Sequence, residues 1–370
     1  MASNRILGLI FANTNEKHLP ELTAYRSTGS VPFGGKYRLI DFPLSNMSNS
    51  GINNIGIVAK SNFMSLMDHV GSGSAWDLAR RRSGLSILPP YGEHSFATLV
   101  ETIFNLHGYI EHGDEDYVLI SPSDCVHNMD YSKVLRFAEK NHSDITFVYI
   151  KKAVKVITDD FRCILDVDSD GKVTKIMASP VDDSECCLDI GVMLMKKTVL
   201  MALVRQAMSE SKYSFVRDVL QKSLDRHRVY AYELTGYCEI ISSIKTYYDA
   251  NMKIMDRDTR YKLFDIRRPI YTKVRDDAPS RYGLDCNVKN SLIAQGCVIN
   301  GIVENSIISK GVYIGHGAVI KNCIVMQDCI IGDKAELVNL VIDKDVNVSR
   351  SSKLQGTQNY PMYIAKRSIV

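Results

Sequence analysis

Near its C-terminus the chain repeats a short motif in which an asparagine precedes small and apolar residues. The copies read NSLI at 290, NSII at 305, NCIV at 322 and NLVI at 339, and the last two intervals are 17 residues, close to three hexads. Apolar residues also recur every six positions, as in Ile308, Ile314 and Ile320. Three flat faces per turn is the geometry of a parallel β-helix, in which each coil buries its apolar row only by stacking on the next. The repeat therefore predicts a β-helix of about four coils.

The first 240 or so residues follow a different pattern, in which β-rich runs alternate with helical ones. RILGLIF, NIGIVA, YVLIS and ITFVYI are strand-like, whereas ATLVETIFNLHGYI has apolar residues at helical spacing. This alternation predicts βαβ units, a mostly parallel sheet and helices on both faces. Because ligands of such sheets bind beyond the carboxyl ends of the strands, we expect residues 12–18 and the segment from Ser121 on one rim.

The two patterns are separated by a stretch that contains Pro269, Pro279 and several charges, which is typical of a connector. We therefore expect three parts. These are an α/β domain over residues 1–245, a connector over 246–287 and the β-helix over 288–370.

The composition excludes several classes of protein. The 45 basic and 42 acidic residues nearly cancel, so the charge gives no reason to expect nucleic acid or a membrane as a partner. No apolar run approaches the roughly 20 residues of a membrane span, and the N-terminus lacks the pattern of a signal peptide, so we expect a cytoplasmic protein. The nine cysteines include no C-x-x-C pair, so neither a disulfide framework nor a zinc site is indicated.

A hexapeptide β-helix can also belong to an acyltransferase, and this alternative was weighed. Such enzymes usually need a basic histidine on a coil face and a long stack of coils. Here the repeats contain one histidine, His316, in a turn. We favour an assembly surface, because the open ends and edges of coils need to be covered.

Several stretches resemble the glucose-1-phosphate adenylyltransferase family. They are VPFGGKYRLIDFPLSNMSNSGI (31–52), GSGSAWDL (71–78), ILPPY (87–91), YYDANM (247–252) and the repeated tail. The resemblance implies a Rossmann-like nucleotidyltransferase domain followed by a left-handed β-helix, acting in bacterial glycogen synthesis. It also implies the reaction of ATP with glucose 1-phosphate, assisted by Mg²⁺, to give ADP-glucose and pyrophosphate. Catalysis of this kind depends on cations and backbone N–H groups that hold the phosphates.

The phosphate loop of this family departs most from its pattern. The family motif G-G-x-G-x-R-L aligns with Asn13, Thr14, Asn15, Glu16, Lys17, His18 and Leu19. Glycine lets the backbone approach a triphosphate, and side chains at these positions obstruct that approach. Glu16 adds repulsion of about 4 kcal/mol for a phosphate charge about 4 Å away at an effective dielectric near 20, before screening. The resemblance therefore implies a degenerate nucleotide site at Asn13, Thr14, Glu16 and His18.

Other positions that the resemblance assigns to chemistry are changed as well. The lysine that contacts pyrophosphate aligns with Thr28, the lysine that holds the sugar phosphate with Ser179, and a second metal-binding aspartate with Ser214. The nucleotide-cupping motif G-T-A-D-A keeps only Thr98, and W-R-D-V-G-T appears as CEIISS from Cys238. The metal-binding aspartate of G-D-H survives as Asp124, so Mg²⁺ would find one carboxylate where the family offers two.

Together these losses remove the groups that stabilise transferring charge, whereas the stretches that support the fold are kept. The chain thus resembles the GlgD-type subunits, and we expect a non-catalytic or weakly catalytic regulatory subunit of ADP-glucose pyrophosphorylase. Its expected partner is a catalytic GlgC-type subunit, within a heterotetramer. No cofactor is expected unless residual activity remains, which would require Mg²⁺ at Asp124.

Two alternatives stay open. The chain could be an active nucleotidyltransferase with altered substrate preference, in which Lys17, His18 or Arg217 supplies substitute charge. It could also be a binding module for a sugar-phosphate or nucleotide effector. The consecutive Arg80, Arg81 and Arg82 motivate this second alternative, because guanidinium groups recognise phosphate.

Overall fold

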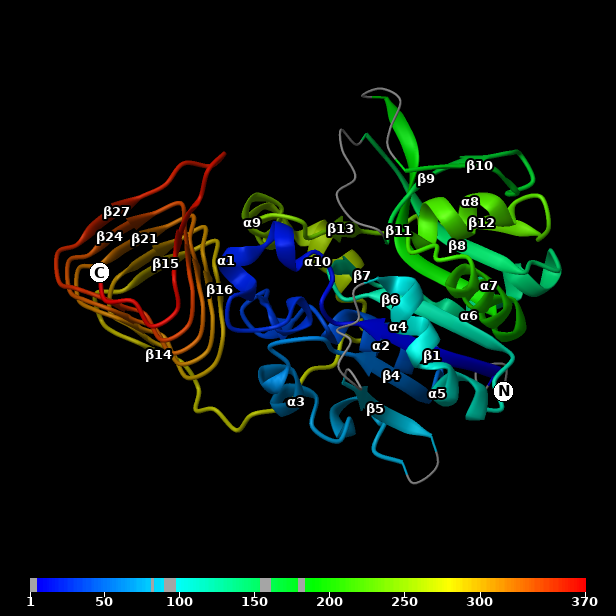
Figure 1. The fold of residues 1–370 in the computed structure, drawn as a ribbon. Coiled ribbons are helices and arrows are strands. Elements are labelled where there is room, and N and C mark those ends of the chain that lie inside the picture. Colours follow the sequence, from blue (N-terminus) through cyan, green and yellow to red (C-terminus); the bar gives the residue numbers. More distant parts are fainter. Residues whose placement is uncertain (1–4, 81–82, 90–97, 154–160, 179–183) are drawn as a thin grey trace.

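The computed structural model describes residues 5–80, 83–89, 98–153, 161–178 and 184–370. An α/β part that contains the N-terminus lies beside a stack of flat coils that contains the C-terminus (Figure 1). The predicted fold class is confirmed in both parts.

A nine-stranded sheet forms the centre of the α/β part. Its strands are β1 (Ile6–Phe11), β4 (Asn54–Val58), β5 (Gly84–Leu88), β6 (Tyr117–Pro122), β8 (Ile145–Ala153), β9 (Ile164–Val167), β10 (Val173–Met177), β11 (Glu185–Lys196) and β12 (Val229–Glu233). Parallel pairing joins β6, β1, β4 and β5, and also β8 and β12. β11 runs antiparallel to β6, β8 and β9, and β10 runs antiparallel to β9. Seven of the nine strands thus run in one direction and only β10 and β11 of this sheet run against them, so the sheet is mostly parallel, as predicted.

Helices cover both faces of this sheet. The helices of the α/β part are α1 (Pro20–Thr23), α2 (Asp41–Asn49), α3 (Met64–Val70), α4 (Leu99–Asn105), α5 (His107–His112), α6 (Tyr131–Lys140), α7 (Lys197–Ser209) and α8 (Gln221–Ser223), with the short turns η2 (Glu16–His18), η3 (Thr28–Ser30) and η4 (Ser74–Trp76) and the π-helix η5 (Phe215–Leu220). One apolar core includes residues of α4, α7 and η5, and the other includes residues of α2, α3 and α6. The single helix expected over 97–110 is two helices, which meet at Leu106.

Three five-stranded parallel sheets build the β-helix. The first contains β14 (Arg281–Tyr282), β17 (Val298–Ile299), β20 (Tyr313–Ile314), β23 (Ile330–Ile331) and β26 (Asn347–Val348). The second contains β15 (Asn287–Lys289), β18 (Ile302–Glu304), β21 (Val319–Lys321), β24 (Glu336–Val338) and β27 (Lys353–Gln355). The third contains β16 (Leu292–Ile293), β19 (Ile307–Ile308), β22 (Ile324–Val325), β25 (Leu340–Ile342) and β28 (Met362–Ile364).

The six-residue period places one apolar residue of each coil on the inner face of each of the three sheets. Ile308, Ile314 and Ile320 lie in the third, first and second sheets and are fully buried. The count of about four coils was wrong by one. The last coil, which contributes β26, β27 and β28, lacks the asparagine motif by which the others were counted.

The asparagine of each repeat turns a corner of the coil. Asn290, Asn305, Asn322 and Asn339 all have a positive φ, between 40° and 54°. Asparagine tolerates this left-handed conformation better than most residues. The amide groups also stack, because Asn290 donates to Asn305 Oδ1 at 2.7 Å and Asn322 donates to Asn339 Oδ1 at 3.1 Å.

The two parts share a core. Helices α9 (Ile244–Lys253) and α10 (Arg257–Leu263) pack there with apolar residues of segment 31–42 and of three coils. The segment 32–38 folds as the hairpin of β2 (Pro32–Phe33) and β3 (Tyr37–Arg38), and a Cβ at its turn residue Gly35 would meet Ile307 and Ile308 within 3.4 Å. The glycine therefore allows close approach of the β-helix.

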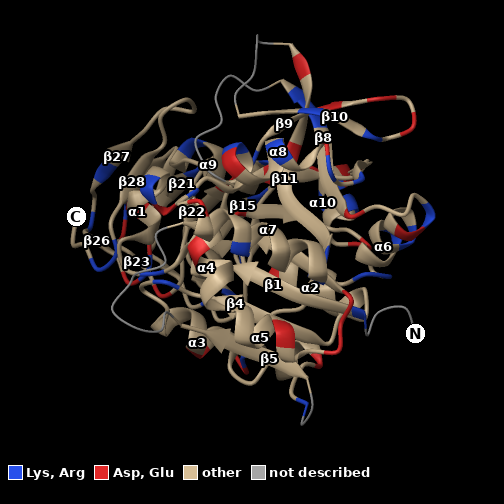
Figure 2. Cartoon of the chain, turned by 45° about the vertical axis from the view of Figure 1, so that its right-hand side comes forward, with Lys and Arg blue, Asp and Glu red and all other residues tan. Residues whose placement is uncertain are grey.

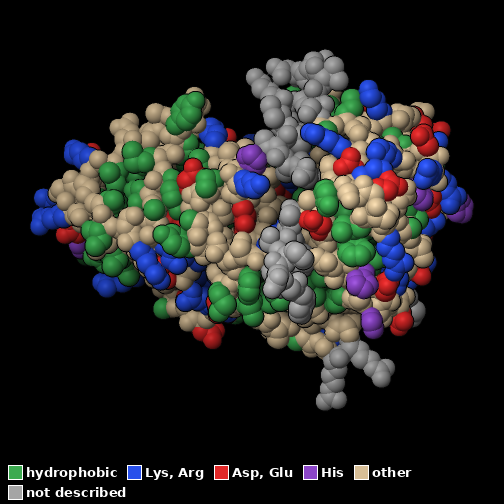
Figure 3. Space-filling view, viewed as in Figure 1, with side chains coloured by type: hydrophobic (Ala, Val, Ile, Leu, Met, Phe, Trp, Pro, Cys, Tyr) green, Lys and Arg blue, Asp and Glu red, His purple; other side chains and the backbone are tan. Residues whose placement is uncertain are grey.

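Acidic and basic residues are interspersed along the chain, and no part of it carries one sign alone in this view (Figure 2). Hydrophobic side chains also reach the outer face of the β-helix (Figure 3). Among the described residues, no helix combines the length and the apolar character that a membrane span requires.

Candidate functional site

The strand ends bring the two predicted site segments together. β1 and β6 pair in parallel up to Phe11 and Pro122, and the Ser123 N–H donates to Phe11 O at 3.1 Å. The loop after β1 and the segment around Asp124 therefore lie on the same rim of the sheet. This rim is at the carboxyl ends of β1 and β6, where ligands of such sheets bind.

The loop after β1 is filled by its own side chains. Asn13 Nδ2 donates to Glu16 Oε1 at 2.6 Å, and Asn13 Oδ1 accepts from the Lys60 N–H at 2.7 Å. Ser61 Oγ donates to Glu16 Oε2 at 3.4 Å. Burial raises the pKa of Glu16, although the hydrogen bonds from Asn13 and Ser61 lower it. A carboxylate held here opposes the approach of a phosphate group.

Thr28, at the position of the family's lysine, points back into this loop. Its hydroxyl donates to Thr14 O at 2.6 Å, and both residues are buried. The carbonyl oxygen of Thr14 thus accepts its hydrogen bond from a side chain of the protein. A cation that could reach pyrophosphate is replaced by a hydroxyl that closes the loop.

Asp124 is buried and paired within the protein. Arg162 contacts it with two nitrogens, Nη2 to Oδ1 at 2.5 Å and Nη1 to Oδ2 at 3.1 Å, and Asn15 Nδ2 donates to Oδ2 at 2.5 Å. Asp124 is 0% and Arg162 3% exposed. Arg162 could not be recognised from the sequence, because a single arginine before a strand belongs to no motif.

Strand pairing identifies another neighbour of Asp124. β7 (Cys125–His127) pairs antiparallel with β13 (Cys238–Ile240), so that Ile240 lies opposite Cys125, and the Ile241 N–H donates to Asp124 O at 2.8 Å. In the alignment of W-R-D-V-G-T with CEIISS, Ile240 takes the place of the aspartate. An isoleucine cannot bind a cation.

Ser214, at the position assigned to the second metal-binding aspartate, has a structural role. It begins η5, where its Oγ accepts from the Arg217 N–H at 3.3 Å and its own N–H donates to Asp218 at 3.1 Å. η5 packs in the core that contains α4 and α7.

The residues around Asp124 do not fit Mg²⁺. This ion needs oxygen ligands in near-octahedral geometry, and both oxygens of Asp124 already accept hydrogen bonds from Arg162 or Asn15. Among the residues that the structure describes, no three His, Cys, Asp or Glu side chains come together as a metal site.

The remaining predicted site residues are dispersed. Thr98 caps α4, with its Oγ1 accepting from the Glu101 N–H at 3.2 Å in a capping box. Lys17 and His18 are exposed on η2. Ser179 lies outside the described residues.

The arginine cluster is described only at its first member. Arg80 Nη2 contacts Asp77 Oδ2 at 2.7 Å, so part of its charge is compensated by a neighbour. Arg81 and Arg82 lie outside the described residues.

A strongly basic cavity lies instead at the junction of the α/β part and the β-helix. It has a volume of about 310 Å³, and Asp68 is the carboxylate on its wall. Its positively charged side chains are Lys36, Arg38, Lys273, Arg275, Lys310 and Lys344. Burial, together with Arg38 and Arg26, lowers the pKa of Lys344 to about 7. This site could not be recognised from the sequence, because its charged residues are scattered from 36 to 344.

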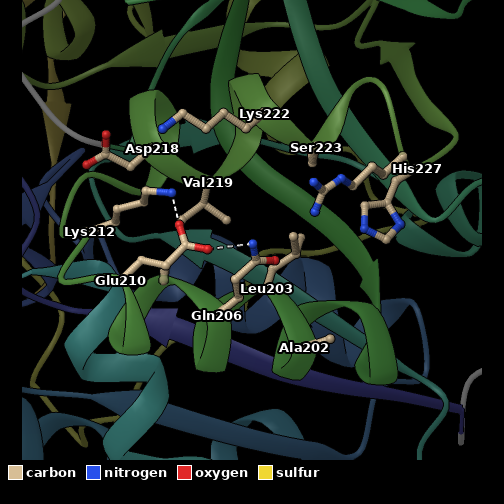
Figure 4. A pocket seen from close by; sticks show the side chains of 12 residues that line it. Ala202, Leu203, Gln206, Glu210, Lys212, Asp218, Val219, Lys222, Ser223 and His227 are labelled. Atoms are coloured by element: carbon tan, nitrogen blue, oxygen red, sulfur yellow. Dashed lines mark hydrogen bonds and ion pairs between the residues drawn. The ribbon is translucent and has the colours of Figure 1, made fainter.

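A further pocket of about 260 Å³ lies between α7 and the segment of η5 and α8 (Figure 4). Two of its charged groups are compensated, because Glu210 contacts Lys212 and accepts from Gln206 at 2.7 Å. The dashed contacts in Figure 4 show both partners of Glu210. None of the positions assigned to catalysis by the sequence lines this pocket.

Comparisons with known proteins agree with this architecture. The family of nucleotidyl transferases matches residues 7–257, and the GlmU-like C-terminal hexapeptide family matches residues 273–357. The chain is 34% identical over 369 residues to the glycogen biosynthesis protein GlgD of Bacillus subtilis, covering 99% of this chain and 97% of the relative. It is 33% identical to a glucose-1-phosphate adenylyltransferase of Halalkalibacterium halodurans, covering 84% and 82%. It is also 31% identical to that of Clostridium perfringens, covering 86% and 84%.

Proposed function

Since this chain belongs to the glucose-1-phosphate adenylyltransferase family, we propose that it is a non-catalytic regulatory subunit of ADP-glucose pyrophosphorylase in glycogen biosynthesis. Its partner in this proposal is a catalytic subunit of the GlgC type, and the assembly is a heterotetramer. The relatives named GlgD and glucose-1-phosphate adenylyltransferase support a role and a partner of this kind.

The observation that carries the proposal is the closed phosphate loop. Asn13 and Glu16, in the segment that aligns with the family's phosphate loop, bond to each other, Glu16 accepts from Ser61, and Thr28 donates to the loop carbonyl of Thr14. Side chains in this loop obstruct the approach of phosphate groups to the backbone N–H groups, and the carboxylate of Glu16 repels phosphate. Because electrostatic stabilisation is the main contribution to phosphoryl transfer, turnover should fall by many orders of magnitude.

A non-catalytic subunit would act on its partner through an interface. Contacts that favour the active state of the catalytic subunit raise the population of that state. The shared core between the α/β part and the β-helix supports this role, because it keeps the outer surfaces in a fixed relation.

The test compares the chain alone with the mixed complex. The purified chain, given ATP, glucose 1-phosphate and Mg²⁺, should release pyrophosphate at a negligible rate. Co-expression with the catalytic subunit of the same genome should give a complex whose kinetics differ from those of the catalytic subunit alone. Turnover of the isolated chain at an ordinary enzymatic rate, abolished by Asp124→Ala, would contradict the proposal and favour an active enzyme with altered substrate preference.

A nucleotide screen addresses that alternative separately. A nucleotide present at a hundred times its Kd should stabilise the folded chain by about 2.7 kcal/mol. The closed loop leads us to expect no change in melting temperature with any nucleotide triphosphate.

The basic cavity favours a second candidate function, binding of an anionic effector such as a sugar phosphate. The wall carries six basic side chains and the carboxylate of Asp68. Asp68 pairs with Lys273, and Asp277 pairs with Arg275 and Lys310, so an anion would be held mainly by Lys36, Arg38 and Lys344. Glucose 1-phosphate should raise the melting temperature of the wild-type chain, and Lys344→Met should reduce this rise. Lys353→Met, at an exposed position of β27, is the matched control. An equal rise in the Lys344 variant, with loss in the combined replacement of Arg80, Arg81 and Arg82, would assign the effector to the arginine cluster instead.

A further inference from the structure

We propose that the guanidinium group of Arg162 is a built-in cation that takes the place of a metal ion at Asp124. This inference deepens the proposed function, since it explains how a former metal site is stable in a subunit without catalysis. Its test uses metal binding and stability, so that its outcome is separate from any measurement of turnover.

The contact between Arg162 and Asp124 has the geometry of a two-point ion pair. Nη2 and Nη1 each face a different carboxylate oxygen, at 2.5 and 3.1 Å. Both side chains are nearly inaccessible to solvent. A buried carboxylate needs a positive charge and hydrogen bonds to offset its lost hydration, and the planar guanidinium supplies both.

The charge that Arg162 supplies is permanent. Arginine stays protonated in proteins, whereas a bound metal ion comes and goes with its concentration. A divalent ion at Asp124 would have to displace the guanidinium or lie beside it, and both alternatives are unfavourable. The wild-type chain should therefore ignore Mg²⁺ at this position.

The backbone around Arg162 is fixed by the sheet and by an aromatic contact. Arg162 precedes β9, and Cys163 O accepts from the Asp189 N–H of β11 at 2.9 Å. Phe161 packs edge to face on Phe11, the last residue of β1, with ring centroids 5.2 Å apart. These contacts hold the guanidinium at the rim where β1 and β6 end.

Other oxygen atoms are buried on the same rim of the sheet as Asp124. Among the described residues, Thr14 Oγ1, Asn15 Oδ1 and Ser123 Oγ have no hydrogen-bond partner. The amide of Asn15 bonds Asp124 through its nitrogen, and Ser123 precedes Asp124 in the chain. Oxygen is the ligand atom that Mg²⁺ and Mn²⁺ prefer. Removal of the guanidinium should therefore leave a site that regains affinity for a divalent cation.

The experiment measures melting temperature in EDTA, Mg²⁺ and Mn²⁺, and Mn²⁺ binding by the loss of the free-ion electron paramagnetic resonance signal. The wild-type chain should melt within about 1 °C under all three conditions. Arg162→Ala removes the guanidinium that faces both oxygens of a buried carboxylate, so it should melt about 5 °C or more lower in EDTA, regain part of this loss in Mn²⁺, and bind Mn²⁺. Arg267→Ala, at an exposed ion pair with Asp265, is the control and should match the wild type.

A double variant separates the charge from general damage. Arg162→Ala combined with Asp124→Asn removes both charges, so it should melt higher in EDTA than Arg162→Ala alone and should not respond to Mn²⁺. If Arg162→Ala does not fold in EDTA, the yield of folded protein in Mn²⁺ is measured instead, and a higher yield supports the proposal. Wild-type binding of Mn²⁺, or an Arg162→Ala variant that gains neither stability nor binding from Mn²⁺, would overturn it.

Discussion

Lys344, at the junction of the two parts, has a strongly lowered pKa. The free energy of unfolding should therefore depend on pH. Burial is the largest cause and Arg38 and Arg26 add repulsion, so that the pKa falls from 10.5 to about 7. Between these values the unfolded chain binds a proton that the folded chain has released. The free energy of unfolding therefore rises with pH from about 7 towards 10.5, and below pH 7 the full cost of the buried charge is present.

Lys344→Met should remove this dependence. The variant should be more stable than the wild type at pH 6.5, and the difference should shrink by at most about 1.4 kcal/mol per pH unit as the pH rises to 9. Melting curves from pH 6 to 9 measure it. Lys353→Met, whose side chain is 72% exposed in the wild type, should keep the wild-type slope. A wild-type slope in the Lys344 variant would show that another group titrates.

The positions Thr28 and Glu16 differ from the family not only in residue type but also in the contacts that they make. The sequence identified Thr28 and Glu16 as losses of a lysine and a glycine. The structure adds that both positions are now part of a hydrogen-bonded loop, through Thr14 O and through Asn13 and Ser61. A single reversion such as Thr28→Lys would therefore place a buried ammonium group where a hydroxyl now closes the loop.

Among the coils, the asparagine corners decide how one turn stacks on the next. Asn322 has a φ of 51°, and its Nδ2 donates to Asn339 Oδ1 at 3.1 Å. A non-glycine residue other than asparagine or aspartate pays about 1–2 kcal/mol for this backbone conformation. The corner therefore combines a backbone preference with an amide ladder.

Two substitutions at Asn322 separate these contributions. Asn322→Gly loses the amide contact but keeps access to positive φ, whereas Asn322→Ala loses both. We expect the alanine variant to be about 1 kcal/mol less stable than the glycine variant in urea denaturation. Equal stability of the two would show that the backbone conformation contributes little at this corner.

At the scale of the whole molecule, a buried ion pair joins the two parts, in addition to the core that they share. Arg26, before η3, contacts Asp343, after β25, at 2.8 and 3.0 Å, and the two side chains are 3% and 1% exposed. The hydroxyl of Tyr363, in β28, lies within hydrogen-bond distance of the same carboxylate, at 2.8 Å, and of Glu21 O, at 2.7 Å. Breaking such a pair leaves an uncompensated buried charge.

Asp343→Asn should therefore lower the free energy of unfolding by about 3–5 kcal/mol, measured by urea denaturation. Replacement of both partners, Arg26→Met with Asp343→Leu, should recover much of this loss, since no buried charge remains. Asp265→Asn, at the exposed pair with Arg267, is the control and should change stability by less than about 1 kcal/mol. A loss at Asp343 no larger than the control would contradict a structural role for the junction.

The sequence by itself determined the architecture. Apolar residues six apart, such as Ile308, Ile314 and Ile320, required three faces per coil, and strand-like runs alternating with helical ones required a sheet covered on both faces. These patterns are local, because each depends on the geometry of a few successive residues. Comparison with the family motifs also identified which functional residues had been replaced. Asp124 is one of those that are kept.

Only the tertiary structure decided what became of that site. Arg162 is 38 residues from Asp124, the pairing of β13 with β7 places Ile240 opposite Cys125, next to Asp124, and the basic cavity gathers charged residues between 36 and 344. Contacts of this kind depend on how segments that are distant in the sequence pack together. No period or spacing in a single sequence indicates which distant segments will meet. The charge of a buried carboxylate must still be compensated, so the partner can be identified once the fold brings it within hydrogen-bond distance.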